Sequence, residues 1–305
     1  MSGHSLSASL RRGWRDYLEL TKPKVVSLIT FTAMVGMFLA TPGMVPWEVL
    51  LLASLGIALM AGSAAAINHL VDRQVDSLMA RTRRRPLPRG NMEGYQVIVF
   101  ATLIGGLGFW LLWLFANPLT AWLTFGSLIG YAVIYTVFLK RATPQNIVIG
   151  GAAGAAPPLL GWTAVTGQVD PPAIWLFLII FVWTPPHFWA LAIHRRQEYA
   201  LADIPMLPVT HGVAFTRLQI FLYTIVLFLI SLMPYLTGMS GLLYLVGAVG
   251  FGLRFLWYAF KLYTSADDRL AMPTFGYSIL YLFALFSALM IDHYLWPVIA
   301  QLPIG

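Results

Sequence analysis

The sequence predicts an all-α, polytopic membrane protein with nine transmembrane helices. Over 305 residues the composition is 59% hydrophobic and only 10% charged, far from the balance of a soluble domain. Nine apolar stretches are each long enough to cross a bilayer, and basic residues alternate between the loops that connect them. Little of the chain is left for a soluble domain.

The apolar stretches define the expected spans, because a transmembrane helix needs roughly 20 apolar residues. They are 25–41, 49–70, 95–115, 118–138, 146–162, 173–193, 215–237, 241–262 and 274–296. We expect residues 25–296 to form one membrane domain between a cytoplasmic N-terminal tail, 1–24, and a short C-terminal tail, 297–305. No cleavage site of small residues follows the first stretch, so we expect that helix to be retained.

The basic residues predict the orientation of the chain. All of the 19 Lys and Arg residues except Arg254 lie in the N-terminal tail or in and beside the even-numbered loops. This alternation follows the positive-inside rule, which places the N-terminus and the even-numbered loops in the cytoplasm. The net charge of +7 therefore reflects membrane topology, and we expect no nucleic-acid partner.

Small and helix-breaking residues predict how the helices pack. The runs AGSAAAIN and GGAAGAAPPLLGW would let neighbouring helices approach closely. Pro185 and Pro186 lie inside the sixth stretch, where we expect them to break or kink the helix. The absence of cysteine excludes disulfides, thiolate metal sites and cysteine nucleophiles, and the absence of a glycine-rich phosphate loop leaves ATP-driven chemistry unsupported.

Polar side chains at the end of the second span form the first candidate site. Asn68, Asp72 and Asp76 are spaced i, i+4 and i+8, so on a helix they line one face. Carboxylates at this depth need a partner, and three oxygen-bearing side chains suit Mg²⁺, which keeps its other positions for water and substrate phosphate. The alternative is a solvated helix end whose acids pair with Arg73 and Arg81.

A second acidic cluster follows the sixth span on the same predicted face of the membrane. The long loop there contains Glu198 and Asp203. Acidic residues and an excess of arginine on one face of the membrane are typical of a site that binds a diphosphate through metal ions. In such a site carboxylates hold the ions, and basic side chains bind the remaining diphosphate oxygens. The candidates for binding the diphosphate oxygens are Arg73, Arg81, Lys140, Arg141 and Arg195. Each of them could equally serve only to keep its helix end in the cytoplasm.

Histidines near the cytoplasmic end of the sixth helix could meet a porphyrin. His187, His194 and Glu198 follow one another at i, i+7 and i+11, roughly on one face. His187 and His194 are candidates for contact with a heme iron, and a hydrogen bond to a backbone or carboxylate partner is the alternative. The aromatic side chains of WTPPHFW could wall a flat ligand or a prenyl chain, or pack in the core.

Several blocks of the sequence resemble one enzyme superfamily. The motif N-x-x-x-D-x-x-x-D followed by RTRRRPLPRG resembles the first aspartate-rich motif of the intramembrane prenyltransferases. Within that superfamily, DSLMARTRRRPLP, LKRATPQNIVIGGAAGAAPPLLGW, WTPPHFWALAI and EYALADIPMLPVTHG are similar to blocks of the protoheme IX farnesyltransferases, or heme O synthases. The similarity is dense from Glu19 to Thr210 and more diffuse through the last three spans.

The resemblance implies nine helices around a central cavity open to the cytoplasmic side. It also implies that Mg²⁺ and farnesyl diphosphate are held at two acidic motifs, with heme B as the acceptor. By position, Asn68, Asp72 and Asp76 match the first motif and would be catalytic residues and metal ligands.

The second motif matches less well. Glu198 takes the acidic position before the tyrosine, here Tyr199, which we include among the heme contacts. Many members of the superfamily have D-x-x-x-D here, whereas Glu198 and Asp203 are five residues apart and Gln197 is not an acid. Glu198 and Asp203 are the expected metal ligands of this motif, and Glu198 would also be a catalytic residue. How a second ion is held stays open.

The resemblance implies transfer of a farnesyl group from farnesyl diphosphate to the 2-vinyl group of heme B, with addition of water, giving heme O and diphosphate. It further implies a bacterial inner-membrane enzyme with its active site toward the cytoplasm, which hands heme O to heme A synthase or terminal oxidase assembly. The alternatives are a prenyltransferase acting on an aromatic quinone precursor, a membrane transporter and a heme chaperone. A transporter would need charged residues near the middle of the bilayer and on both sides of it, whereas here the acids cluster on one face. A heme chaperone would need no diphosphate site, which the acidic stripe predicts.

Overall fold

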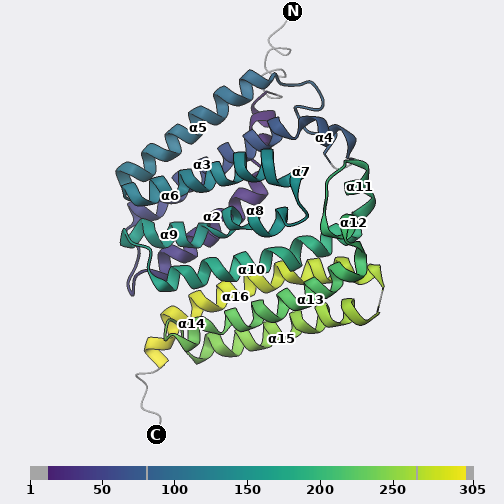
Figure 1. The fold of residues 1–305 in the computed structure, drawn as a ribbon. Helices are drawn as coiled ribbons and strands as arrows, with labels where there is room; N and C mark the ends of the chain where they lie inside the picture. Colours follow the sequence, from purple (N-terminus) through teal and green to yellow (C-terminus); the bar gives the residue numbers. More distant parts are fainter. Residues whose placement is uncertain (1–12, 80–81, 266, 300–305) are drawn as a thin grey trace, which may run out of the picture.

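The computed structural model describes residues 13–79, 82–265 and 267–299, with side chains through Leu295. Within these ranges the chain forms helices and connecting turns, and no strand occurs. The predicted all-α membrane class is confirmed. Figure 1 shows the long helices running side by side, with the short helices of the two long loops gathered at one end of the molecule.

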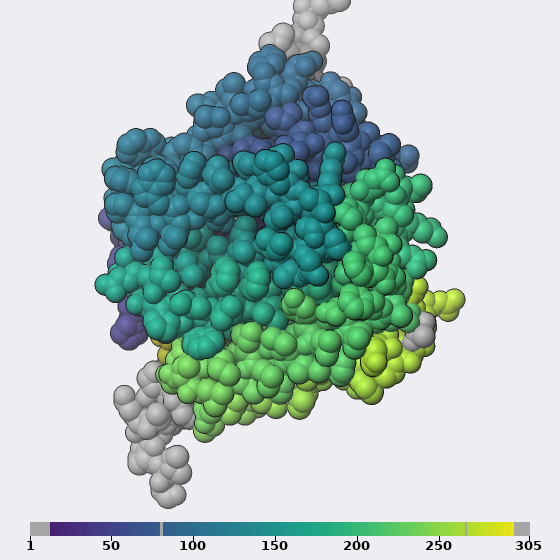
Figure 2. Space-filling view, viewed as in Figure 1, coloured from purple at the N-terminus to yellow at the C-terminus, as the bar shows by residue number. Residues whose placement is uncertain are grey.

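The first half of the chain forms α2 to α9. Their bounds are α2 Pro23–Leu39, α3 Trp47–Val71, α4 Arg73–Leu78, α5 Gly94–Phe115, α6 Pro118–Ile129, η1 Gly130–Leu139, α7 Lys140–Ala142, α8 Asn146–Ala155 and α9 Pro157–Thr166. The second half forms α10 Pro171–His194, α11 Arg196–Leu201, α12 Leu207–Thr210, α13 Gly212–Ser231, α14 Met233–Leu236, α15 Leu242–Ser265, η2 Asp268–Leu270 and α16 Ala271–Ile299. In the space-filling view, the earlier residues, in blue, lie in the upper part of the viewed face and the later residues, in green, lie in its lower part (Figure 2).

The number of spans agrees with the prediction once a bend is counted. By length and composition, 8 helices or continuous helix pairs in the described chain could each cross a membrane. The ninth is α2, whose 17 residues follow a short helix, Gly13–Leu20, at an angle of 48°. Counting that bent pair as one span gives up to 9 among the described residues.

Two spans differ locally from their expected form. The fourth passes from α6 into a ten-residue π-helix, η1, before α7. A π-helix is rare and often lies at a functional site.

The sixth, α10, continues as one helix through Pro185 and Pro186, so of the expected break or kink the break does not occur. Both prolines are buried, and packing of α10 against α8, α13 and α16 holds the helix together where two backbone donors are missing.

Small residues allow α2 and α9 to touch backbone to backbone. An added Cβ on Gly161 would lie 1.8 Å from the carbonyl oxygen of Ala33, and one on Gly36 would lie 2.0 Å from that of Pro158. Gly161 belongs to the run GGAAGAAPPLLGW, so the predicted close approach is confirmed at this crossing. The contact fixes the first span against the fifth.

Candidate active site

The stripe of Asn68, Asp72 and Asp76 is buried rather than solvated. Each of the three residues is at most 4% exposed. Helix α3 ends at Val71 and α4 begins at Arg73, and the amide of Asp76 still donates to the carbonyl of Asp72 at 2.8 Å. The Asn68 amide also donates to Asp72 Oδ2 at 2.9 Å, so the side chains lie together as their spacing predicted.

Basic side chains from three other segments meet this stripe. Lys22 Nζ donates to Asn68 Oδ1 at 2.5 Å, and Lys140 Nζ lies 2.6 Å from Asp72 Oδ2. The Arg85 guanidinium lies 2.6 Å from Asp76 Oδ2. Among the described residues, the acids therefore pair with Lys140 and Arg85 and not with Arg73, whereas Arg81 lies outside the described residues. Within the described part of the chain two acids thus face three basic side chains, an arrangement that suits a bound anion.

The π-helix positions two of these partners. Lys140 immediately follows η1, and its backbone amide donates to the carbonyl of Tyr135. Thr136, inside η1, accepts a hydrogen bond from the Asn68 amide at 3.2 Å while donating to the carbonyl of Tyr131 at 2.7 Å. The wide turn of a π-helix thus brings a hydroxyl and an ammonium to the end of α3.

The second acidic cluster reaches the same end of the molecule through hydrophobic packing. Val75 and Met79, beside the first acids, share one buried cluster with Tyr199 and Ile204 of the second loop. Figure 1 places α4 and α11 at this end. Glu198 is half-buried and pairs with Arg195 at 3.1 Å. The two long loops are therefore parts of one folded region.

The remaining predicted residues lie farther out. The exposed ones are Arg73, Arg141, His194 and Asp203, and Asp203 has a left-handed backbone with φ of 50°. Arg81 lies outside the described residues. The predicted residues in direct contact therefore form two groups. Asn68, Asp72, Asp76 and Lys140 form one, and Glu198 with Arg195 forms the other.

The stripe fits Mg²⁺ only together with a substrate. In the part of the chain that the structure describes, no three His, Asp or Glu side chains lie close enough to hold a metal ion by themselves. Mg²⁺, however, is commonly held by one or two carboxylates plus phosphate oxygens and water. The buried carboxylates of Asp72 and Asp76, beside the amide of Asn68, provide that partial set of hard oxygen donors.

His187 is buried in the middle of a tight cluster between α10 and α16. Its ring stacks on Trp183 at 4.2 Å and on Phe275 at 4.5 Å between centroids. Its Nδ1 lies 2.7 Å from Ser278 Oγ. His187 and His194, predicted together, are therefore in different surroundings, one enclosed and one exposed.

Four residues of these clusters were not assigned from the sequence: Lys22, Arg85, Thr136 and Ser278. Arg85 lies in the basic run after Asp76, but nothing in that run distinguishes it from the neighbouring arginines. Lys22, which precedes α2, had been counted only as a topology signal. Thr136 and Ser278 carried no signal, because each reaches its partner across more than 60 residues of chain.

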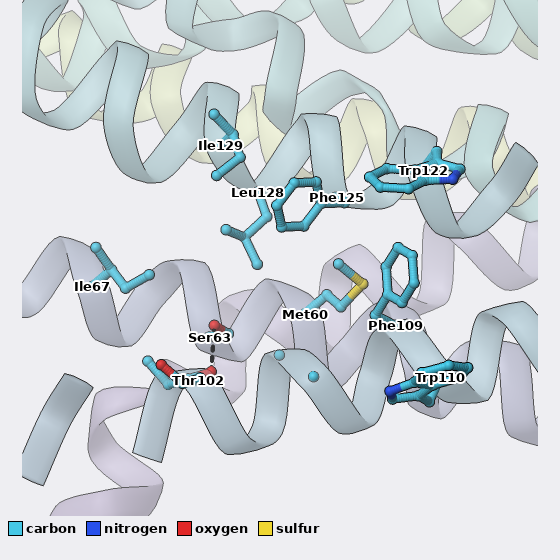
Figure 3. Close-up of a pocket in the computed structure, with 13 residues that line it drawn as sticks. Met60, Ser63, Ile67, Thr102, Phe109, Trp110, Trp122, Phe125, Leu128 and Ile129 are labelled. Carbon is cyan, nitrogen blue, oxygen red and sulfur yellow. Dashed lines mark hydrogen bonds between the residues drawn. The ribbon is translucent and has the colours of Figure 1, made fainter. Parts of the chain in front are cut away.

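A separate apolar groove lies between α3, α5 and α6. Its volume is about 490 Å³, and its lining includes Met60, Ser63, Phe109, Trp110 and Trp122 (Figure 3). Trp110 and Trp122 are more than half exposed, and none of the lining residues belongs to the polar stripe. The groove faces outward from the bundle and is not part of the candidate active site.

Comparison with known proteins identifies the family of the chain. Residues 29–292 match the model of the UbiA prenyltransferase family. The chain belongs to this family. It is 62% identical over 291 residues to protoheme IX farnesyltransferase 1 of Pseudomonas putida strain W619, with 95% of this chain and 98% of that protein covered. Protoheme IX farnesyltransferase of Thioalkalivibrio sulfidiphilus is 60% identical over 290 residues, which covers 95% and 96%.

Solved structures of UbiA-type enzymes have the same fold. Digeranylgeranylglyceryl phosphate synthase superposes with a TM-score of 0.79 at 18% identity, over 92% of this chain and 98% of that one. A UbiA homologue from Archaeoglobus fulgidus, bound to DMAPP and Mg²⁺, gives a TM-score of 0.63 at 16% identity, over 90% and 99%. At these identities the likeness establishes the fold, and the resemblance seen in the sequence blocks is confirmed by the close relatives.

Proposed function

We propose that this UbiA-family protein is a magnesium-dependent heme B farnesyltransferase. It would join the farnesyl group of farnesyl diphosphate to the 2-vinyl group of heme B, add water and release diphosphate, giving heme O. The observation that carries the proposal is the buried stripe of Asn68, Asp72 and Asp76 ringed by Lys22, Arg85 and Lys140. Relatives with 60% identity or more over nearly the whole chain bear the corresponding name.

Ionisation of the diphosphate ester is the step that the stripe would assist. The C–O bond of the allylic ester breaks, and diphosphate leaves with the electron pair. The ammonium and guanidinium groups of Lys22, Lys140 and Arg85 would turn from their protein partners to the diphosphate oxygens and stabilise the developing negative charge. Asn68, Asp72 and Asp76 would hold Mg²⁺, which when bound neutralises charge on the same oxygens.

The allylic cation then forms a C–C bond with the vinyl group of heme B. The cation left beside the porphyrin takes a hydroxyl group from water, and the proton of that water is released, so atoms and charge balance. Exclusion of bulk water by the surrounding helices would limit premature capture of the farnesyl cation. Further contacts at the cytoplasmic rim belong to the proposal as well: Glu198 with Arg195, and Arg73, Arg81, Arg141 and Asp203.

Topology and partners complete the proposal. The alternation of basic loops supports an inner-membrane orientation with a cytoplasmic N-terminus and a site open to the cytoplasm. A heme with a farnesyl tail is too apolar to leave freely into water. We therefore include handover of heme O to heme A synthase or terminal oxidase assembly.

The test is product analysis with purified protein in lipid nanodiscs. Farnesyl diphosphate, heme B and Mg²⁺ are supplied, and extracted hemes are examined by mass spectrometry for a gain of one farnesyl group plus one hydroxyl group. The product should form with Mg²⁺ and disappear with excess chelator. Transfer to an aromatic quinone precursor with no modified heme would overturn the proposal.

A further inference from the structure

We infer that His187 coordinates the iron of the heme acceptor through Nε2, and that Ser278 is the positioning residue that holds the imidazole in the tautomer this requires. The inference deepens the proposed function, on which it rests for the identity of the ligand as a heme. It comes from the hydrogen bonds and ring contacts around one buried histidine.

The ring of His187 is fixed in plane and in position. Trp183, one turn earlier on α10, stacks on one face with an interplanar angle of 18°. Phe275 of α16 stacks at 25°. The indole Nε1 of Trp183 donates to the carbonyl of Ser278 at 2.8 Å, which ties the first stacking partner to the same turn of α16. A side chain held in this way loses little further rotamer entropy when it binds a ligand.

The tautomer follows from the single proton of the serine hydroxyl. Ser278 Oγ donates that proton to the carbonyl of Phe275 at 2.6 Å. At 2.7 Å from His187 Nδ1, the same oxygen must therefore accept, so Nδ1 carries the imidazole proton. A neutral imidazole protonated at Nδ1 has its lone pair at Nε2. Metal-binding histidines almost always donate their other ring N–H in this manner, because the bond orients the ring.

One edge of the ring is left for a ligand. Both faces are covered by aromatic rings, and the Nδ1 edge is taken by Ser278. His187 stays 8% exposed, and its one side-chain hydrogen bond among the described residues is made through Nδ1, not Nε2. His187 also lies seven residues before His194, the last residue of α10, which places it about 10 Å inside the end of the helix. That depth suits an apolar porphyrin better than a hydrated ion.

The other described histidines lack this combination. His194 and His211 are exposed. His293 uses Nε2 in a bond with the carbonyl of Thr41. His69 is 2% exposed, and neither of its ring nitrogens has a hydrogen-bond partner that would orient it. Among these residues, His187 has both an oriented ring and a predicted free lone pair.

The decisive variant is His187→Asn. The asparagine amide can take the place of Nδ1–H and keep the bond to Ser278, but it has no counterpart of Nε2. Nanodisc-embedded protein is titrated with iron protoporphyrin IX and, separately, with metal-free protoporphyrin IX. We expect the variant to lose the imidazole-ligated heme absorption and about tenfold or more in affinity for the iron porphyrin. Affinity for the metal-free porphyrin should change less than about twofold, because only iron meets Nε2.

Ser278→Ala gives a second readout with the imidazole still present. Loss of the bond to Nδ1 frees the ring tautomer, so the iron–histidine stretching frequency in the ferrous complex should shift and iron affinity should fall several-fold. His211→Asn is the matched control, since it removes an exposed histidine. Exogenous imidazole should restore the ligated spectrum to a His187→Gly variant.

The outcome that overturns the inference is a folded His187→Asn protein whose heme spectrum and iron-porphyrin affinity equal those of the wild type. Equal losses for iron and metal-free porphyrin would also overturn it, because they would mark His187 as a packing residue. These measurements need no farnesyl diphosphate. If the protein binds heme through His187 but forms no heme O, the proposed reaction fails while the ligation stands.

Discussion

Lys140 Nζ lies 2.6 Å from Asp72 Oδ2, although 68 residues separate the two positions. The pair joins the end of α3 to the end of the π-helix at the centre of the candidate site. Both side chains are largely buried, so the ion pair is shielded from water. Such a pair is costly to break unless a ligand replaces each partner, and a diphosphate with a divalent cation can do so.

Removing the carboxylate tests its proposed role directly. Asp72→Asn should reduce the rate of heme O formation by at least about 100-fold, the scale seen when transition-state charge stabilisation is lost. Expression and membrane insertion should be retained. Glu48→Gln, which changes an exposed acid at the other end of α3, serves as control. Near-normal turnover of Asp72→Asn would contradict the assignment.

Removing the paired ammonium should weaken substrate binding. For Lys140→Met we expect the KM for farnesyl diphosphate to rise by about tenfold or more, because a charge-assisted hydrogen bond contributes about 1.5–3 kcal/mol. Lys261→Met changes a lysine that lies over the Trp257 ring outside the site and should leave KM unchanged. Steady-state kinetics with varied farnesyl diphosphate measures both.

The basic run after Asp76 offers a comparison between adjacent arginines. Arg85 pairs with Asp76, whereas Arg84 is exposed. Arg85→Gln should reduce kcat/KM by about tenfold or more, since it removes a partly buried cation from the diphosphate site. Arg84→Gln should change it less than about twofold, as expected for an exposed charge. Equal effects would show that the run acts only through its overall charge.

The crossing of α2 and α9 predicts an effect on stability alone. Gly161→Ala would push a methyl group against the carbonyl of Ala33, so we expect a loss of about 1–3 kcal/mol and a lower Tm. Gly154→Ala, for which no atom lies within 4 Å of the added Cβ, should be neutral or slightly stabilising. Thermal unfolding in nanodiscs compares the two. A Gly161→Ala protein as stable as the wild type would refute the close contact.

Replacing a buried acid far from the site should lower the stability of the fold without changing the rate of heme O formation. Asp292, 1% exposed, accepts backbone hydrogen bonds from Gly241 at 2.6 Å and Tyr244 at 3.0 Å at the start of α15. Asp292→Ala should lower stability by about 2 kcal/mol, because it leaves these donors unpaired. The heme O formed per folded molecule should stay unchanged, and a selective loss of turnover would contradict this.

The acidic stripe could be predicted because its information is local. Asn68, Asp72 and Asp76 lie within nine residues, so helical geometry alone places them on one face. Their partners could not be predicted in the same way. Lys22 and Arg85 had no feature that separated them from other basic residues near the cytoplasmic ends of helices. Thr136 reaches Asn68 only because the fourth span turns into a π-helix, and no pattern in the sequence indicates that turn.

The sequence by itself determined the membrane class, the spans and the identity of the acids, because hydrophobic length, charge alternation and helical spacing are properties of neighbouring residues. Tertiary structure decided which base meets which acid, and that α10 continues through two prolines. It also decided that His187 meets Ser278 across 91 residues of chain. These outcomes depend on the packing of distant helices, whose contact energies are shared among many side chains and are not encoded in any single segment.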